Sequence, residues 1–152
     1  MPRKTNKIET KWNNIPSNIE DYKGFLYLIT NTITNQKYIG IKLFWSTTKK
    51  KISGRKNRKI IVKESDWKYY ESSSDTVKSQ IKKYGKENFE FDIIECFDNK
   101  SKLNYSELEY QVKNNVLTSK LPNGDYEYLN ENIIRKFYRT SFEKNEEYDL
   151  EM

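Results

Sequence analysis

The sequence predicts a small α/β domain of the α+β kind, with a three-stranded, mainly antiparallel sheet flanked by helices. Three observations carry this prediction. Residues 24–42 hold two aromatic and β-branched runs on either side of a short polar turn, which favours a β-hairpin. Residues 88–97 begin with alternating apolar and polar residues, as a third strand does. Two further segments, 74–84 and 103–117, place apolar residues at helical spacing.

The hairpin carries two tyrosines at matched places. Its strands are predicted at residues 25–29, FLYLI, and 37–41, KYIGI, and the residues between them suit a turn. Because side chains alternate along a strand, Tyr38 and Lys42 share a face of the second strand. On this pattern alone, packing is the favoured role of Tyr27 and Tyr38.

Composition favours one domain with an anionic partner. The chain has 152 residues, with 28 Lys and Arg against 22 Asp and Glu, a formal net charge of +6. One hydrophobic core suits this length, and nucleic acid is the commonest partner of a basic surface. The alternative is a soluble basic surface without a polyanionic partner. The one cysteine, Cys96, lies in an apolar run and is expected to be a core thiol in a reducing compartment.

The sequence has no histidine, which excludes histidine-based triads and the commonest zinc ligand. Acid–base chemistry would therefore use tyrosine, lysine or carboxylates. No apolar stretch approaches the ~20 residues of a membrane span, and residues 1–11 lack the apolar centre of a signal peptide. We expect a cytoplasmic protein without membrane contact, in the host cell if the chain is encoded by a phage.

Two polar segments flank or interrupt the predicted domain. Residues 1–23 read as a basic N-terminal arm with at most a short ordered piece. Residues 46–63 form a basic insertion, typical of a loop or flexible finger. Its cations could hold phosphates, although a solvated loop is equally consistent; they are Lys49, Lys50, Lys51, Arg55, Lys56, Arg58 and Lys59.

The first helix has clear end signals. Ser73 or Ser74 can accept a backbone N–H bond at its start, and Gly85 marks its end after Tyr84. A helix N-terminus can also bind phosphate, so Ser73 is a candidate nucleic-acid contact.

The second helix presents a candidate carboxylate. Tyr105, Leu108, Val112 and Val116 are expected to form its core-facing stripe, and Glu107 is one position off that stripe. Most helical glutamates are merely solvated. After a turn at residues 122–125, an aromatic and asparagine-rich segment follows at 126–133, and residues 136–152 read as a charged tail.

The order of these elements resembles the GIY-YIG nuclease family. The tripeptide Tyr38-Ile39-Gly40 is the family's second motif verbatim, and Phe25-Leu26-Tyr27 stands for the first, with Gly24 one place early. The eleven-residue step from Tyr27 to Tyr38 suits the family pattern. The helix, the glycine turn at Gly85 and the third strand follow in the order seen in phage-type, freestanding members, some of them called homing endonucleases.

The resemblance implies functional roles for several residues. Tyr27 and Tyr38 would be the catalytic tyrosines. Glu107, followed by Tyr110, is similar to the metal-binding glutamate of the family, and it would hold Mg²⁺, with Mn²⁺ as a possible substitute. Asn130, with Asn132 close behind, would be the asparagine that steadies the site.

The sequence departs from the family pattern at one basic residue. The family's arginine after the second motif has no counterpart one turn before Tyr69 or Tyr70. Lys42 resembles a lysine found close behind the motif in some members, so we expect Lys42 to stabilise phosphate charge, with Arg55 and Arg58 as alternatives. Tyr70 is the candidate for the tyrosine of that helix.

The sequence thus predicts a nuclease domain at residues 24–135 that acts as a metal-dependent DNA endonuclease. One metal and one site imply one cut per event, and a monomer is favoured. A catalytically silent DNA-binding module of the same fold is the first alternative. A repair- or restriction-type nuclease that recognises DNA structure is the second.

Overall fold

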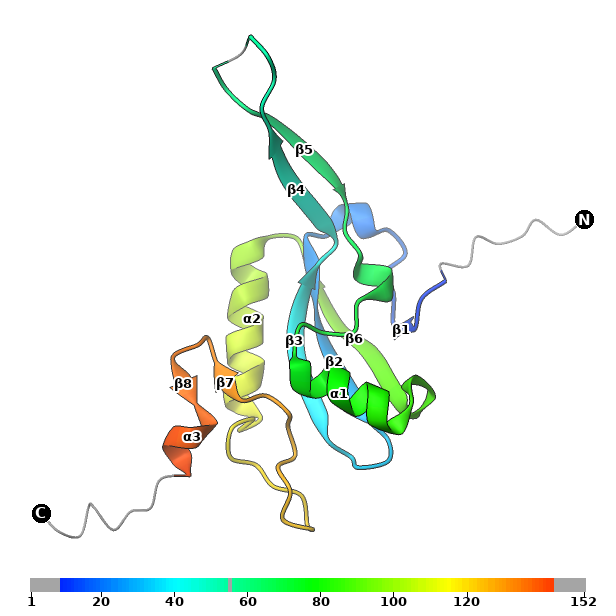
Figure 1. The fold of residues 1–152 in the computed structure, drawn as a ribbon, viewed down its shortest axis with the longest axis vertical. Helices are drawn as coiled ribbons and strands as arrows, with labels where there is room; N and C mark the ends of the chain where they lie inside the picture. Colours follow the sequence, from blue (N-terminus) through cyan, green and yellow to red (C-terminus); the bar gives the residue numbers. More distant parts are fainter. Residues whose placement is uncertain (1–8, 55, 144–152) are drawn as a thin grey trace, which may run out of the picture.

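A four-stranded sheet with the order β1-β6-β2-β3 forms the centre of the computed structural model, which describes residues 9–54 and 56–143 (Figure 1). Strands β2 (Gly24–Asn31) and β3 (Lys37–Leu43) form the expected hairpin. Strand β6 (Phe89–Phe97) pairs with β2 in the antiparallel direction. The mixed α+β class and these three strands are as the sequence predicts.

The expectation of three strands is wrong by one, because residues before Gly24 add a fourth. Strand β1 (Trp12–Asn13) lies parallel to β6. The Trp12 side chain is 4% exposed, and its indole N–H donates to the carbonyl oxygen of Trp67 at 2.9 Å. Burying a large ring with its N–H satisfied brings this part of the chain onto the sheet. The described part of the predicted N-terminal arm therefore packs on the domain, and a 3-10 helix, η1 (Ile19–Asp21), links it to β2.

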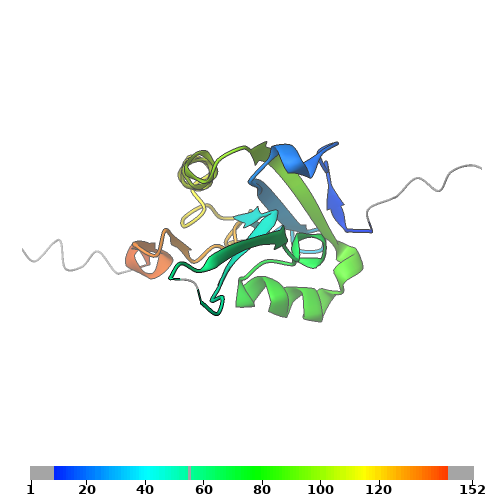
Figure 2. The ribbon, with the colours of Figure 1, turned by 90° about the horizontal axis from the view of Figure 1, so that it is seen from above.

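The two longer helices lie on opposite faces of the sheet (Figure 2). Helix α1 (Asp75–Tyr84) inserts Val77 into the aromatic core on one face. Its end signals are confirmed: the Ser74 hydroxyl accepts the N–H of Val77 at 3.3 Å, and Gly85 follows the last turn with φ 90°. Helix α2 (Lys100–Lys113) covers the other face.

The core-facing stripe expected for residues 103–117 is confirmed at Leu108 and Val116, which pack in the core, and wrong at its two other positions. Tyr105 and Val112 are 66% and 57% exposed. The inward line runs instead through Leu103, Glu107 and Gln111, which stand four residues apart and are buried or half-buried. Two polar residues occupy this line, so apolar spacing selects the neighbouring face of the helix.

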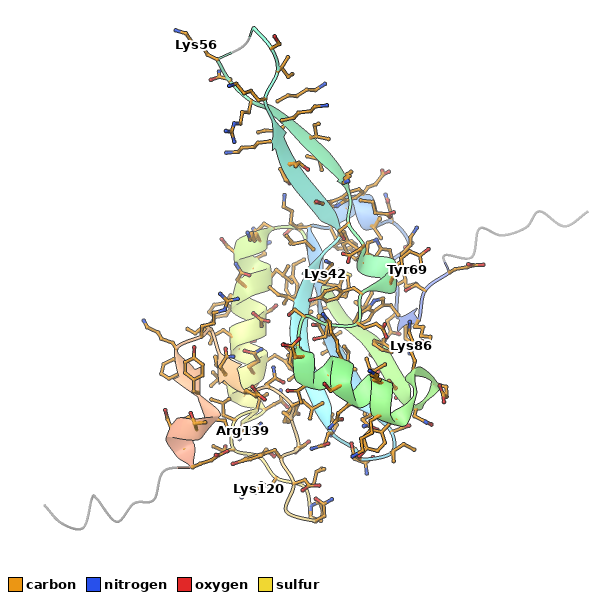
Figure 3. The ribbon with its side chains drawn as sticks, in the orientation of Figure 1. Lys42, Lys56, Tyr69, Lys86, Lys120 and Arg139 are labelled. Carbon is orange, nitrogen blue, oxygen red and sulfur yellow. The ribbon has the colours of Figure 1, made fainter. Side chains whose placement is uncertain are left out.

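The basic insertion is a β-ribbon, which corrects the expected loop or flexible finger. Strands β4 (Trp45–Lys50) and β5 (Lys59–Glu64) pair antiparallel and project from the domain (Figure 1). Figure 3 shows Lys56 at the far end of this ribbon. The 3-10 helix η2 (Trp67–Tyr69) then returns the chain to the core, where Trp67 is fully buried. A further 3-10 helix, η3 (Lys86–Asn88), joins α1 to β6.

The start of the predicted charged tail is also ordered. Strands β7 (Asn132–Ile133) and β8 (Phe137–Tyr138) pair, and the short helix α3 (Arg139–Phe142) follows. The Arg139 guanidinium donates to the carbonyl oxygens of Val116 and Tyr128 at 2.7 and 2.6 Å. The folded region therefore extends past residue 135, and residues 144–152 of the predicted tail lie outside the described residues. No helix among the described residues is long and apolar enough to cross a membrane.

Candidate active site

A polar cavity of about 450 Å³ lies where β3, α2 and the N-terminal end of α1 meet. We call it the catalytic cavity. Four of the predicted site residues line it, namely Tyr38, Ser73, Glu107 and Asn130. Its other lining residues include Ser74, Asp75, Thr76, Gln111, Glu131, Asn132 and Arg135. Residues up to about a hundred positions apart in the sequence thus meet at one site.

Tyr38 projects from the edge strand β3 and is half-buried. Burial raises the pKa of its phenol, and the nearby Glu107 carboxylate raises that pKa further, whereas hydrogen bonding to Ser72 and Ser73 opposes the shift. The Tyr38 phenol is therefore protonated at neutral pH. In this state its hydroxyl can both donate and accept a hydrogen bond in the cavity.

Tyr27 lies behind Tyr38 and is only 1% exposed. The two rings lie 6.2 Å apart between centroids. Gly40 makes this packing possible, because a Cβ atom on Gly40 would come within 2.6 Å of the Tyr27 ring carbon that carries the hydroxyl. Burial, followed by the neighbouring Tyr70, raises the pKa of Tyr27 well above its ordinary value. Of the two predicted catalytic tyrosines, Tyr38 lines the cavity and Tyr27 supports it from the core.

Glu107 reaches the cavity from the middle of α2. Burial raises the pKa of its carboxyl group above the ordinary value. Within residues 9–54 and 56–143, no lysine or arginine forms an ion pair with Glu107. A half-buried carboxylate without a cationic partner is a suitable ligand for a divalent cation, which would offset its lost hydration.

Asn130 holds the backbone of the edge strand beside Tyr38. Its amide oxygen accepts the N–H of Ile39 at 3.1 Å, and its amide nitrogen donates to the carbonyl oxygen of Ile39 at 2.8 Å. Gln111 donates to the same carbonyl oxygen at 3.2 Å. These bonds fix the position of β3 relative to α2 and to the segment before β7.

The serines before α1 bring a further polar group to the tyrosines. Ser73, the candidate nucleic-acid contact, lines the cavity. Ser74 also lines it and is the N-terminal cap of α1. Ser72 is buried with φ 89°, a conformation uncommon for a residue with a side chain, and the Ser72 side chain lowers the pKa of both Tyr27 and Tyr38, against the effect of burial. Sequence analysis did not identify Ser72, because the serines before the helix were interpreted as cap and phosphate-binding residues, and only Ser73 and Ser74 suit those roles.

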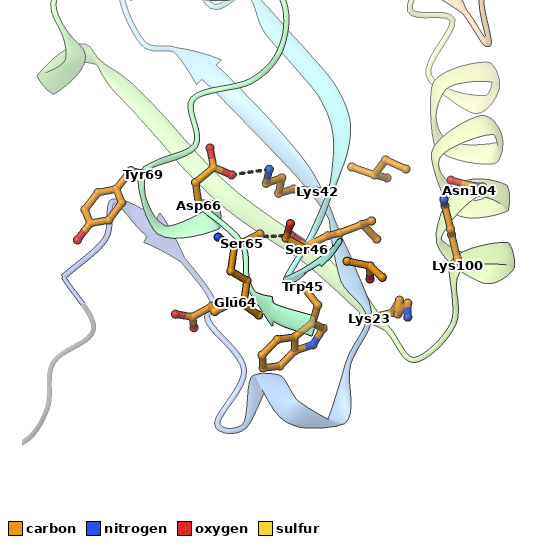
Figure 4. Close-up of a pocket in the computed structure, with 14 residues that line it drawn as sticks. Lys23, Lys42, Trp45, Ser46, Glu64, Ser65, Asp66, Tyr69, Lys100 and Asn104 are labelled. Atoms are coloured by element: carbon orange, nitrogen blue, oxygen red, sulfur yellow. Dashed lines mark hydrogen bonds and ion pairs between the residues drawn. The ribbon is translucent and has the colours of Figure 1, made fainter. Parts of the chain in front are cut away.

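Lys42 and Tyr70 do not line the catalytic cavity. The Lys42 ammonium group forms an ion pair with Asp66 at 2.7 Å and lies 4.2 Å from the centroid of the Tyr70 ring. A hydrogen bond from Lys42 lowers the pKa of the Asp66 carboxyl group. Figure 4 shows this pair at a second cavity, which opens at the opposite end of β3 from Tyr38.

The cations of the ribbon are likewise away from the catalytic cavity. Six of its predicted nucleic-acid contacts are described, and all are exposed: Lys49, Lys50, Lys51, Lys56, Arg58 and Lys59. Arg55 lies outside the described residues. The ribbon positions are accessible to a large polyanion and do not meet Tyr38 or Glu107.

Arg135 is the basic residue that lines the catalytic cavity, and the sequence reading missed it. It stands in the turn between β7 and β8 with φ 54°, next to Ile134 with φ 49°. Its backbone N–H donates to the side-chain oxygen of Asn132 at 3.0 Å. A left-handed conformation is rare for a β-branched residue such as Ile134, so no turn signal in the sequence predicted this placement.

The site residues fit a sparsely liganded metal. Across the described part of the chain, no three or more carboxylate, cysteine or histidine side chains cluster as a ready metal site. Glu107 would therefore be the chief protein ligand. Magnesium suits such a site, since it keeps several water ligands and takes further oxygens from a substrate phosphate.

A small α+β domain whose neighbouring strands carry paired tyrosines, with a glutamate facing the second of them, defines the GIY-YIG class of nuclease domains. Residues 7–133 match a family model described as "Putative endonuclease segE, GIY-YIG domain". The chain belongs to this GIY-YIG endonuclease family, which confirms the resemblance seen in the sequence. No curated protein and no solved structure matches the chain.

Proposed function

We propose that the protein is a metal-dependent DNA endonuclease that hydrolyses one phosphodiester bond per event in the catalytic cavity. The observation that carries the proposal is that Tyr38 and Glu107 line the same polar cavity, although they come from different elements. Membership of the GIY-YIG family supports phosphodiester hydrolysis as the reaction. DNA as substrate agrees with the net charge of +6 and with the exposed basic ribbon.

Glu107 would hold the divalent cation. When bound, Mg²⁺ would stabilise charge on the phosphate and on the leaving oxygen. The carboxylate must be ionised to bind the cation, and its raised pKa means that burial disfavours this state in the free protein. Binding of the cation would favour the ionised form, so metal affinity should rise with pH.

Tyr38 would orient the attacking water. Its raised pKa keeps the phenol neutral, and a neutral hydroxyl can hydrogen bond to water without removing a proton. The positive charge of the bound cation would lower the pKa of Tyr38, because it favours the phenolate. Proton removal by Tyr38 would then become accessible.

Arg135 would supply the positive charge on the phosphate. It lines the catalytic cavity, whereas Lys42 is about four residues of extended strand, roughly 13 Å, from Tyr38. Guanidinium groups bind phosphate oxygens through two parallel N–H bonds, which a lysine cannot do. The cation absent from the family position would thus come from the C-terminal turn.

Plasmid cleavage tests this function. Wild type would be incubated with supercoiled plasmid and Mg²⁺, beside Glu107→Gln and Tyr38→Phe. Glu109→Gln and Tyr105→Phe are controls with the same chemical changes, because Glu109 and Tyr105 are exposed residues of α2, the helix that carries Glu107. We expect wild type and controls to nick the plasmid, and each site variant to lose roughly a hundredfold or more in rate.

Two other outcomes would assign a different function. A folded wild type that binds the plasmid but never cuts it with Mg²⁺ or Mn²⁺ would be a silent DNA-binding module. Cleavage of nicked or branched duplexes in strong preference to linear duplex would identify a nuclease that recognises DNA structure.

A further inference from the structure

A second cavity, of about 1090 Å³, opens at the end of β3 that carries Lys42 (Figure 4). We call it the lysine groove. Lysines from four separate segments line it: Lys23 stands before β2, Lys42 in β3, Lys63 in β5 and Lys100 at the start of α2. Because four distant segments deliver one type of charge to one concave surface, the groove has a distinct electrostatic character.

The carboxylates in the groove are already paired. Asp66 binds Lys42 at 2.7 Å, and Glu64 lies 3.5 Å from Lys68. In the described portion of the chain, Lys23, Lys63 and Lys100 form no ion pair. Their side chains are exposed, so three positive charges remain available to a ligand.

The base of the ribbon forms one wall of the groove and extends its basic surface. Lys63 stands opposite Ser46 in the β4–β5 register. Because side chains alternate along a strand, the same ribbon face continues outward to the Lys50–Lys59 pair. Trp45 lies at the ribbon base, where its indole N–H donates to the carbonyl oxygen of Tyr22 at 2.9 Å. That bond anchors the wall to the domain.

The groove and the catalytic cavity share two elements. Strand β3 contributes Tyr38 to the catalytic cavity and Leu43 to the groove, five residues further along, or about 17 Å in an extended strand. Helix α2 contributes Asn104 to the groove and Glu107 to the catalytic cavity, less than one turn apart. A single extended ligand can therefore reach both.

We infer that the lysine groove is a second substrate site, which binds the phosphate backbone of the same DNA duplex beside the bond to be cut. The inference rests on the proposed function for the identity of that bond. Phosphates follow one another every 3.4 Å of helix axis along a strand, so about 17 Å corresponds to about five base pairs. Contacts to phosphates fix position rather than sequence. The groove therefore holds the duplex in register with Tyr38.

The salt dependence of binding tests the groove directly. The probe is a duplex of about 30 base pairs, titrated without metal, so that binding is measured apart from cleavage. The groove variant combines Lys23→Gln, Lys63→Gln and Lys100→Gln. The control variant combines Lys82→Gln, Lys113→Gln and Lys120→Gln, which are exposed residues that line neither cavity and remove the same charge.

Each lysine that neutralises a phosphate contributes about 0.9 to the slope of log K against log salt. We expect the groove variant to reduce that slope by about 2.7, and the control variant to leave it nearly unchanged. Equal slopes for the two variants would overturn the inference. Thermal melting would verify that both variants fold.

Plasmid nicking separates this inference from the proposed function. The groove variant should need more DNA than wild type to reach its half-maximal nicking rate, whereas the control variant should need as much DNA as wild type. If wild type nicks and both variants bind with the same slope, the nuclease function stands and the groove is excluded. If the slopes differ as expected and wild type never nicks, the groove stands and the nuclease function falls.

Discussion

Asn130 binds both backbone polar groups of Ile39, accepting the Ile39 N–H through Oδ1 and donating to the Ile39 carbonyl oxygen through Nδ2. Asn130 is 3% exposed, and Ile39 is buried between Tyr38 and Gly40. A strand at the edge of a sheet has unpaired backbone groups on its outer side. Asn130 satisfies these groups at the position that orients Tyr38, so it couples the stability of the edge strand to the geometry of the site.

Replacement of Asn130 by alanine should destabilise the protein and slow cleavage. The Ile39 N–H would be left buried without a partner, which costs about 1–3 kcal/mol. Gln111 would still donate to the Ile39 carbonyl oxygen, so the strand should stay in place. Urea denaturation measures the change. Asn57→Ala, at an exposed ribbon position, is the control and should stay within about 0.5 kcal/mol of wild type.

The residues that could be predicted from the sequence are those with local signals. The hairpin, the cap of α1 and the stop at Gly85 follow from turn and capping chemistry. Asn130 and Glu107 were predicted through the family's order of elements, and both line the catalytic cavity.

The residues that escaped prediction depend on long-range contacts. Trp12 looks like part of a polar arm until Trp67, fifty-five residues away, provides the acceptor for its indole N–H. Arg135 was assigned next to a tail because its approach to the cavity depends on the left-handed turn at Ile134. Tyr105 and Val112 were wrongly placed on the inner face of α2, because the polar residues Glu107 and Gln111 occupy inward positions that hydrophobic spacing attributes to apolar residues.

Glu107→Gln should stabilise the folded protein at neutral pH, although it removes the proposed metal ligand. The folded-state pKa of Glu107 is raised, so its favourable contribution is present below the unfolded pKa and is lost as pH rises through the folded value. Glutamine removes this pH-dependent loss. The Tm of Glu107→Gln should exceed that of wild type near pH 7, and the gap should close near pH 4, below the ordinary pKa of glutamate.

Addition of Mg²⁺ gives the same comparison a second readout. Bound cation should raise the Tm of wild type and leave that of Glu107→Gln unchanged. Glu109→Gln serves as the control, because Glu109 is exposed on the same helix and should respond to Mg²⁺ as wild type does. An equal rise in Tm for all three proteins would place the cation somewhere other than Glu107.

Arg135→Ala should slow plasmid nicking by roughly tenfold to a hundredfold, because the phosphate would lose a charge-assisted pair of hydrogen bonds. Arg135→Lys should recover part of the rate, since lysine restores the positive charge but not the paired N–H donors of the planar guanidinium group. The neighbouring Lys136→Ala changes an exposed residue outside the cavity lining and should nick normally. Wild-type rates in Arg135→Ala would return the phosphate role to Lys42.

Cys96 should react slowly with thiol reagents. Burial, and to a lesser degree the charge of Glu95, raises the pKa of the Cys96 thiol to about 11. Relative to a free cysteine with a pKa near 8.5, the thiolate fraction at pH 8 should be lower by roughly a hundredfold. Alkylation rates followed by mass spectrometry, with the protein unfolded in urea as reference, provide the measurement. A native rate close to the unfolded rate would exclude the raised pKa.

Arg139→Ala should be among the most destabilising changes in the C-terminal segment, although Arg139 lies beyond the residues that match the family model. Its guanidinium donates to the carbonyl oxygens of Val116, Leu117 and Tyr128, and lies 3.9 Å from the centroid of the Tyr126 ring. We expect a loss of about 2–3 kcal/mol in the free energy of unfolding, since buried acceptors would lose their donor.

Arg139→Lys distinguishes shape from charge at this position. A lysine keeps the charge but cannot donate in the fixed geometry that reaches three carbonyl oxygens, so it should recover less than half of the lost stability. Because Tyr128 stands two residues before Asn130, loosening this anchor should also slow nicking, whereas Lys136→Ala, at an exposed position that lines neither cavity, should change neither property. Full recovery of stability by lysine would mean that charge alone holds the C-terminal segment against the domain. The three hydrogen bonds of the planar guanidinium group would then be dispensable.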